Sequence, residues 1–237
     1  MNTKMKVLSL ALVGAFGYVG AASAACPSSP VPPWTSVFEN QGAAVIASPG
    51  YDSTECRLDS SINAGASFLG AATVTYSQAT IEPRFRAQFI VNADTLTGQA
   101  FADAVQIFAG QSANGGAVSF NIYSFVGNRT LDYKVRMADG SVQSGTATLP
   151  AGEAHVEFDL STASASGASD GYFKLWIQNS NEAAPTSQKD NLANFGRGID
   201  TVNLGLASPT RDYVAHFGGN KVGFDQFDSR RQTFIGF

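Results

Sequence analysis

The chain has 237 residues, a formal net charge of −4 and only 14% charged residues, against about 25% in typical soluble domains. This acidic balance argues against nucleic acid as a partner, because proteins that bind the phosphate backbone usually carry an excess of Lys and Arg. The 24 glycines and the few charges are typical of an exported β protein with many turns. No Pro-rich linker, charge run or internal repeat marks a second domain.

The first 25 residues have the organisation of a cleavable signal peptide. Lys4 and Lys6 precede an apolar run over residues 7–19, and small residues follow as Ala22-Ser23-Ala24-Ala25. Because the run is shorter than the roughly 20 residues of a membrane-spanning helix, we expect no membrane span in the mature chain. Cleavage after Ala24 or Ala25 would leave residues 26–237 as one exported domain, either periplasmic or extracellular. Loss of both lysines leaves 13 of the 15 basic side chains against 19 acidic ones, a net charge of −6.

The two cysteines of the chain predict one disulfide, Cys26–Cys56, because an exported chain with an even number of cysteines normally pairs them. The bond would hold the proline-rich start of the mature chain against the domain. One alternative is lipidation of Cys26, although Ser23 stands where the lipid-attachment motif usually has Leu. The other alternative, two free thiols or a metal site, has no further ligands near either cysteine.

Segments with alternating or β-branched residues recur at intervals of about ten residues after this start. In chain order, we predict strands at residues 36–39, 71–76, 81–91, 103–109, 117–125, 130–137, 143–149, 155–160, 172–177, 201–206 and 221–227. Pro83 stands near the start of the third strand, where a proline is tolerated, and Asp139-Gly140 predicts a tight turn. No segment keeps a helical period, apart from short turns at residues 93–98 and 188–193. The pattern predicts an all-β fold, an antiparallel two-sheet jelly-roll sandwich.

The clearest pair of strands is a hairpin, residues 155–160 and 172–177, whose connection ends in Asp170-Gly171. Alternation turns one set of its side chains toward the core: Val156, Phe158, Leu160, Phe173, Leu175 and Ile177. The opposite face carries His155, Glu157, Asp159, Tyr172, Lys174 and Trp176. We expect a ligand to bind on this second face, since it offers carboxylates, a lysine and two aromatic rings.

Three passages resemble motifs of the concanavalin A-like, laminin G-type jelly rolls found in many exported bacterial proteins. They are Glu55-Cys56-Arg57-Leu58-Asp59, the hairpin of residues 155–177, and Gly223-Phe224-Asp225-Gln226-Phe227-Asp228 with the residues that follow it to Arg231. Related domains often have a Trp before the His of the first hairpin strand, where this chain has Ala154. The resemblance covers most of the mature chain and implies a concanavalin A-like sandwich. Because these are packing motifs, they indicate the fold more than an activity.

Two carboxylates on one strand also resemble part of a catalytic motif. Glu157 and Asp159 project from the same face, as in jelly-roll β-glucanases with a Glu-x-Asp-x-Glu strand, in which one carboxylate attacks the sugar and another donates a proton. Ser161 occupies the place of the third acid. A solvated strand face accounts for both carboxylates without catalysis, and we favour that interpretation.

Alginate lyases of similar fold carry Arg-x-Glu-x-Arg, Gln-Ile-His and Tyr-Phe-Lys motifs, and this chain resembles them in part. It has Arg84 and Arg86, then Gln106-Ile107-Phe108, and then Tyr172-Phe173-Lys174. The resemblance implies that Arg84 or Arg86, Gln106 and Lys174 bind a uronate. Phe108 replaces the His of the second motif and Gln178 replaces a Tyr of the third. Without that base and acid, β-elimination has no evident proton path.

Two further questions concern the aromatic residues and metals. Trp176 and Tyr172 either stack on a sugar ring or lie under loops that cross the sheet, and we favour the second interpretation. His155 and His216 stand in no zinc-binding spacing. Asp-Gly and Asn-rich loops would allow calcium, but no dense Asp-x-Asp cluster predicts it. We therefore predict no metal site and no cofactor, with calcium as the alternative.

Together these observations predict an exported carbohydrate- or surface-polymer-binding β-sandwich without evident catalysis. The alternatives are a polysaccharide lyase or glycoside hydrolase with an atypical site, and a structural envelope or matrix protein. The residues predicted to bind the ligand are Tyr172, Lys174, Trp176, Glu157, Asp159, Arg84, Arg86 and Gln106.

Overall fold

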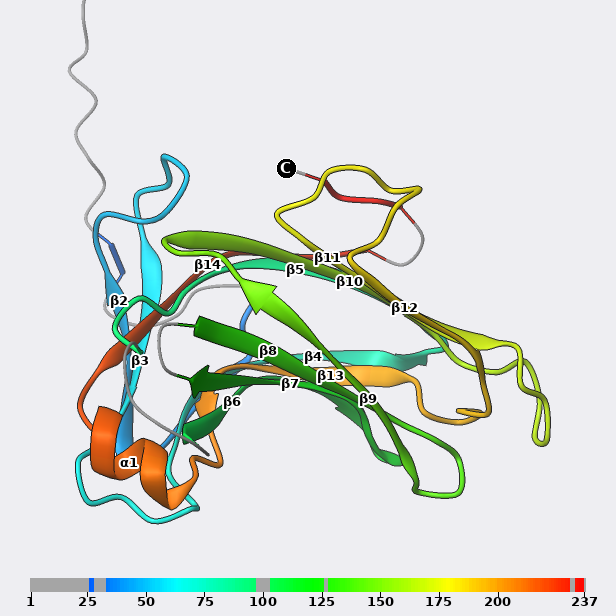
Figure 1. Cartoon of the computed structure of the whole chain (residues 1–237), viewed down its shortest axis with the longest axis horizontal. Coiled ribbons are helices and arrows are strands. Elements are labelled where there is room, and N and C mark those ends of the chain that lie inside the picture. Colours follow the sequence, from blue (N-terminus) through cyan, green and yellow to red (C-terminus); the bar gives the residue numbers. More distant parts are fainter. Residues whose placement is uncertain (1–25, 28–32, 97–102, 126–127, 231–232, 237) are drawn as a thin grey trace, which may run out of the picture.

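The computed structural model describes residues 26–27, 33–96, 103–125, 128–230 and 233–236. Their strands form two antiparallel sheets of seven strands each, packed face to face as a sandwich (Figure 1). The predicted all-β jelly roll is thereby confirmed. The predicted signal peptide lies outside the described residues.

The two sheets have the following strands. Sheet A has the order β1 (Ser36–Asn40), β4 (Ala71–Glu82), β13 (Ile199–Ala207), β6 (Asp103–Ser112), β7 (Gly115–Phe125), β8 (Asn128–Arg136) and β9 (Val142–Leu149). Sheet B has the order β12 (Ser187–Leu192), β11 (Gly171–Ile177), β10 (Glu153–Ser161), β5 (Arg84–Asn92), β14 (Lys221–Arg230), β3 (Arg57–Ile62) and β2 (Gly42–Ala47). The helix α1 (Arg211–Phe217) packs beside β6 at one end of the sandwich (Figure 1).

The centre of the core between the sheets is aromatic. Phe89 and Phe158 of sheet B meet Phe108 and Phe120 of sheet A, with ring centroids 5.1 to 6.3 Å apart. Each of the four is at most 1% exposed. Burial of such rings is a large part of what stabilises a sandwich, because each removes on the order of 150 to 250 Å² from water. The predicted inner face of the hairpin is confirmed, since its six apolar side chains are all buried.

The predicted disulfide is also confirmed. Cys26 and Cys56 are bonded, and the described residues contain no free cysteine. The bond attaches residue 26 to the chain just before β3. It therefore holds the start of the described chain against sheet B.

One predicted strand, residues 81–91, is two strands in the structure. β4 ends at Glu82 in sheet A and β5 begins at Arg84 in sheet B, so Pro83 marks the place where the chain changes sheet. Proline has no N–H for a strand ladder and a fixed φ, which suits a corner better than a strand interior. The corner is held by a hydrogen bond from the N–H of Thr162 to the carbonyl of Pro83 at 2.7 Å.

Four elements were not predicted: β2, β3, β12 and α1. The turn predicted at residues 188–193 is wrong, because most of that segment forms β12, whose polar sequence lacks apolar alternation. Residues 93–96 do form a turn, and residues 97–98 lie outside the described chain.

The helix α1 has only seven residues, too few to show a helical period. It begins after Thr210, whose hydroxyl accepts a hydrogen bond from the N–H of Tyr213 at 3.2 Å.

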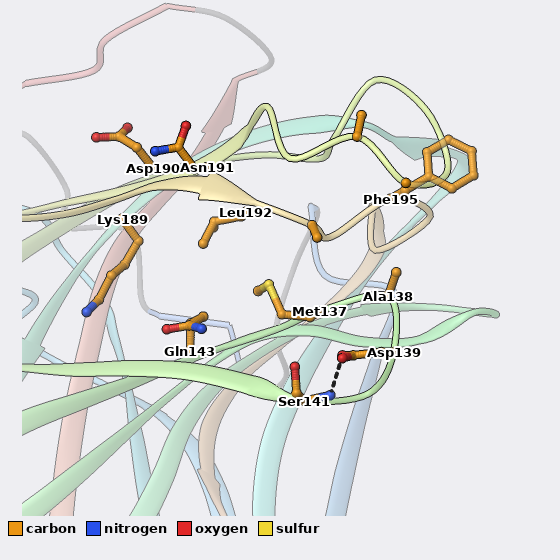
Figure 2. A pocket seen from close by; sticks show the side chains of 13 residues that line it. Met137, Ala138, Asp139, Ser141, Gln143, Lys189, Asp190, Asn191, Leu192 and Phe195 are labelled. Atoms are coloured by element: carbon orange, nitrogen blue, oxygen red, sulfur yellow. Dashed lines mark hydrogen bonds between the residues drawn. The ribbon is translucent and has the colours of Figure 1, made fainter.

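The edge strands β9 and β12 lie on the same side of the sandwich, and a cleft opens between them (Figure 2). No helix in the described part of the chain is long and apolar enough to cross a membrane.

Candidate functional site

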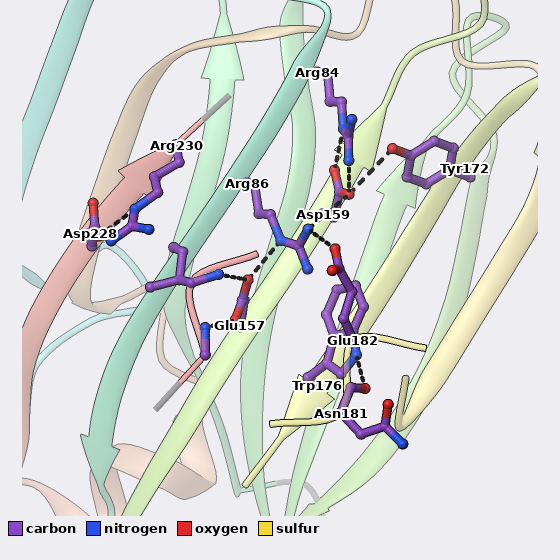
Figure 3. A network of polar contacts seen from close by, with 12 residues as sticks. Arg84, Arg86, Glu157, Asp159, Tyr172, Trp176, Asn181, Glu182, Asp228 and Arg230 are labelled. Carbon is purple, nitrogen blue, oxygen red and sulfur yellow. Dashed lines mark hydrogen bonds and ion pairs between the residues drawn. The ribbon is translucent and has the colours of Figure 1, made fainter. Parts of the chain in front are cut away.

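Seven of the eight residues predicted to bind a ligand come together on the outer face of sheet B. Figure 3 shows all of them except Lys174. They come from three adjacent strands, because β10 pairs with β5 on one side and with β11 on the other. Asp159 is directly opposite both Arg86 and Lys174, and Glu157 is opposite Trp176. The strand register therefore places side chains that are distant in sequence within contact of one another.

Arg86 is the centre of this cluster and is only 1% exposed. Its Nε donates a hydrogen bond to Glu157 at 2.7 Å, and its Nη1 donates one to Glu182 at 2.8 Å. The guanidinium carbon lies 4.7 Å from the ring centroid of Trp176 and 4.6 Å from that of Phe234. A buried cation is tolerated only where charge and hydrogen bonds compensate it. Here carboxylates and two aromatic faces do so.

Two segments of the chain itself cover this cluster. Residues 233–236 cross the outer face of sheet B, where the N–H groups of Ile235 and Gly236 each donate to the Glu157 carboxylate at 3.0 Å. The β11–β12 loop covers the other side, and the indole N–H of Trp176 donates to the carbonyl of Asn181 at 3.1 Å. In Figure 1 both segments lie above sheet B, on the side away from sheet A.

The outer face of the hairpin is consequently not the open surface that its polar residues predicted. Glu157 and Asp159 are 4% and 2% exposed, so the interpretation of both as a solvated strand face is wrong. Trp176, at 2% exposure, agrees with the favoured alternative that crossing segments cover it. Alternation shows only that a side chain points away from the core, and it cannot reveal a later segment that packs over it.

At the rim of the cluster, Arg84, Tyr172 and Lys174 remain partly exposed. Arg84 makes a two-pronged ion pair with Asp159, with N–O distances of 2.8 and 3.1 Å. The Tyr172 hydroxyl donates to the same carboxylate at 3.3 Å. Burial, reinforced by the negative charge of Asp159, raises the pKa of Tyr172 to about 12. These three side chains are the part of the cluster that a ligand can reach.

Gln106 is separate from the other seven residues, because β6 belongs to sheet A. The three motifs shared in part with alginate lyases are therefore not assembled into one site. Arg86 and Lys174 lie on the outer face of sheet B, whereas Gln106 lies in grooves of sheet A. The residue two positions later in the Gln-Ile-Phe motif, Phe108, is buried in the core.

Gln106 lines an open groove of about 610 Å³ on the outer face of sheet A, a volume within the range of about 300 to 1,000 Å³ typical of ligand sites. None of the side chains that line this groove, which we call the sheet A groove, is charged. Its hydrogen-bonding side chains include Thr75, Asn203 and Gln106. Its apolar wall includes Phe38 and Leu69, which are 56% and 61% exposed.

The polar groups of the sheet A groove have capacity left for a ligand. The Thr75 hydroxyl donates to the Asn203 side-chain oxygen at 2.8 Å, which orients that amide and leaves its NH₂ group as a donor. The Gln106 amide has no hydrogen-bond partner among the described residues. At Gln106 the groove meets a second, smaller one of about 210 Å³, which extends to Lys134 and Arg136 on β8.

Phe38 and Asn203 were not among the residues predicted to bind a ligand. Phe38 faces Thr73 across the β1–β4 register, and Asn203 faces Thr75 across the β4–β13 register. A weak signal existed in the alternation of Ser36, Phe38 and Asn40 along β1. It could not be interpreted without the strand order, because the four strands that carry the groove are far apart in the sequence.

The histidines and possible metal ligands do not form a further site. Among the described residues, no three side chains of the types that ligate metals gather at one point. The Nδ1 atom of His216 lies 2.8 Å from the Asp103 carboxylate, at the contact of α1 with β6. Partial burial lowers the pKa of His155.

Comparison with known proteins identifies only a shared fold. Neither a scan against protein-family models nor a search of curated proteins gave a match. A solved structure named cellulose induced protein, Cip1, aligns with a TM-score of 0.57 and 18% identity over 84% of this chain and 89% of that chain. The receptor binding domain of botulinum neurotoxin type G aligns with a TM-score of 0.50 and 10% identity over 83% of this chain and 44% of that one.

The receptor binding domain of the botulinum neurotoxin C/D mosaic serotype gives a TM-score of 0.50 and 7% identity, over 84% of this chain and 44% of that one. The chain thus spans less than half the length of the neurotoxin domains that it matches. At such identities these likenesses show the fold alone.

Proposed function

We propose that this protein is an exported polysaccharide-binding module and that the sheet A groove holds a neutral stretch of the polymer. The observation that carries the proposal is an open groove with amide and hydroxyl groups on its floor, an exposed phenylalanine on its wall and no charged lining residue. Of the residues predicted from the sequence, the proposal uses Gln106. Arg86, Trp176 and Glu157 instead contact the C-terminal segment of the chain, and Asp159 pairs with Arg84.

The composition of the groove matches the chemistry of a sugar ring. A sugar presents hydroxyl groups around its edge, which pair well with the amides of Asn203 and Gln106 and the hydroxyl of Thr75. Its two faces present C–H groups, which pack against an aromatic ring such as that of Phe38. Exposing Phe38 and Leu69 to water has no benefit for folding, and such exposed apolar groups beside a polar groove are typical of binding sites.

Export is part of the proposal and has independent support. The disulfide Cys26–Cys56 requires an oxidising compartment to persist. The basic and apolar residues that precede it have the order of a signal peptide. An exported protein encounters the polysaccharides of cell surfaces and of the extracellular matrix.

The proposal is tested by affinity electrophoresis of the mature domain through gels that contain neutral polysaccharides. At least one polymer should retard the wild type, and Phe38→Ala should lose about 1 to 3 kcal/mol of binding free energy, the range of a binding anchor. Gln106→Ala should lose less, because it removes one hydrogen-bonding group. The matched control is Val45→Ala, which removes apolar surface that is 49% exposed on β2 of the other sheet.

Three outcomes decide among the alternatives. Retardation that Phe38→Ala abolishes, with no new reducing ends or unsaturated products in the polymer, supports a binding module. Release of such products by the wild type would make the protein an enzyme. No retardation by any polymer would contradict the proposal and favour a structural role.

A further inference from the structure

The cleft between the edge strands β9 and β12 is a second concave site, and it shares no lining residue with the grooves of sheet A. It has a volume of about 460 Å³. The β8–β9 turn and the start of β9 form one wall, and β12 with the residues after it forms the other (Figure 2). This cleft, which we call the edge cleft, is large enough for a small ligand.

Lys189 projects into the edge cleft. It pairs with Phe173 across the β11–β12 register, so strand alternation turns its side chain toward the inner side of the sandwich, as it does that of the buried Phe173. Figure 2 shows its side chain directed into the cleft, toward the wall that contains β9. As a whole residue, Lys189 is half-buried.

In the described part of the chain, the ammonium of Lys189 lacks the carboxylate partner that Lys134 and Lys221 have. Lys134 lies 3.6 Å from Asp132 and Lys221 lies 3.8 Å from Asp59. Lys174 lies 5.4 Å from the ring centroid of Tyr172. For Lys189, no carboxylate of the described chain is within 4 Å of its nitrogen.

The two acidic residues that line the same cleft do not supply this counter-ion. The Asp139 carboxylate accepts a hydrogen bond from the N–H of Ser141 at 2.8 Å. The Asp190 carboxylate accepts one from the Gln188 amide at 2.6 Å, and Figure 2 shows it directed away from Lys189. Because an ammonium forms its strongest hydrogen bonds with an anion, and no carboxylate of the described chain pairs with Lys189, the cleft favours an anionic group close to this side chain.

The rest of the lining suits a sugar that carries such a group. The Gln143 amide and the Ser141 hydroxyl offer hydrogen bonds to ring hydroxyls. Met137 and Leu192 form an apolar floor, and Phe195 stands at the mouth of the cleft with 44% of its surface exposed. The exposed ring and the polar groups match the face and the hydroxyl groups of a sugar, and Lys189 offers a partner for an acidic group on it. The two lining carboxylates, Asp139 and Asp190, are held by Ser141 and Gln188.

We infer that the edge cleft binds a sugar bearing a carboxylate or a sulfate, with Lys189 as its cationic partner and Phe195 against its ring. This site is separate from the sheet A groove and does not depend on the function proposed for that groove. The simpler explanation is that Lys189 only prevents β12 from pairing with another chain, as inward-pointing charges on edge strands do. That explanation needs no ligand, and it predicts self-association when the charge is removed.

The test is an NMR titration of the ¹⁵N-labelled mature protein at constant ionic strength. The probes are glucuronate, glucose 6-sulfate and glucose. One or both anionic sugars should shift amide signals of residues 137–143 and 189–195, and glucose should not. Which of the two anions binds more tightly distinguishes a carboxylate site from a sulfate site. Lys189→Gln should weaken this binding by about tenfold or more, whereas Lys221→Gln, the same charge change at an exposed site, should leave it unchanged.

The inference is overturned if neither anionic sugar shifts these signals, if glucose shifts them equally, or if Lys189→Gln binds as well as the wild type. Sedimentation velocity of Lys189→Gln checks the simpler explanation, which gains support if the variant dimerises while sugar binding is unaltered. Phe38→Ala should not affect the titration. Failure of the sheet A groove and failure of the edge cleft are therefore distinguishable.

Discussion

The backbone N–H of Ile235 donates a hydrogen bond of 3.0 Å to the carboxylate of Glu157, a residue 78 positions earlier in the chain. Glu157 in turn accepts a hydrogen bond from Arg86 at 2.7 Å, and the ring of Phe234 lies 4.6 Å from that guanidinium. The C-terminal segment thus occupies sheet B as a bound peptide would. The charged residues that suggested a ligand site have a partner within the same chain.

Removal of residues 233–237 should expose Trp176 and lower the melting temperature of the domain. The reason is that Phe234 lies 5.5 Å from Trp176 between ring centroids, and the segment covers both Arg86 and Glu157. The measurement is tryptophan fluorescence on a Trp34→Phe background, because the chain has only two tryptophans. Emission should move to longer wavelength in the truncated protein and, to a smaller extent, in Phe234→Ala. Unchanged emission in both would show that this segment does not cover the indole in solution.

Much of the fold could be predicted because its signals are local. The alternation of Val156, Phe158 and Leu160 fixes which face of β10 is buried, whatever lies beside it. Asp139-Gly140 forms the predicted turn, since Gly140 has a φ of +88°, which favours glycine. The expectation of export, together with an even cysteine count, sufficed to predict the disulfide Cys26–Cys56.

The site could be predicted only in part, because it depends on contacts between distant segments. The register places Asp159 beside Lys174, as the shared face of the hairpin suggested. It also places Asp159 beside Arg86, whose strand the sequence could not place next to the hairpin. No local sequence pattern indicates that residues 233–236 also contact Glu157. The sheet A groove combines Phe38 with Gln106 only through the strand order β1-β4-β13-β6, which no short pattern specifies.

Substitutions at two neighbouring positions of β10 should both destabilise the protein, for different reasons. Phe158→Asp places a charge in the core beside Phe108 and Phe120, and it should unfold the domain. Asp159→Asn should cost about 1.5 to 3 kcal/mol of unfolding free energy, because its carboxylate accepts charged hydrogen bonds from Arg84 while only 2% exposed. If Asp159 lay on an open strand face, Asp159→Asn would instead have almost no effect on the free energy of unfolding. Urea denaturation measures both.

The matched control for Asp159→Asn is Asp228→Asn on β14. Its side chain is 42% exposed and pairs with an exposed Arg230, so the change should stay within about 0.5 kcal/mol. Equal losses at the two positions would contradict the buried role of Asp159.

Tyr172→Phe should alter how stability depends on alkaline pH. The pKa of Tyr172 is raised from 10.0 to about 12, mainly by burial and then by Asp159. With a raised pKa in the folded state, the unfolded chain loses this proton first. The stabilisation is therefore fully present below pH 10 and is lost as the pH rises toward about 12. In urea denaturation at a series of pH values from about 9 to 12, the wild type should lose stability more steeply than Tyr172→Phe. Parallel profiles would show that the hydroxyl titrates alike in the folded and unfolded chains, and that it lies outside the Arg84–Asp159 network in solution.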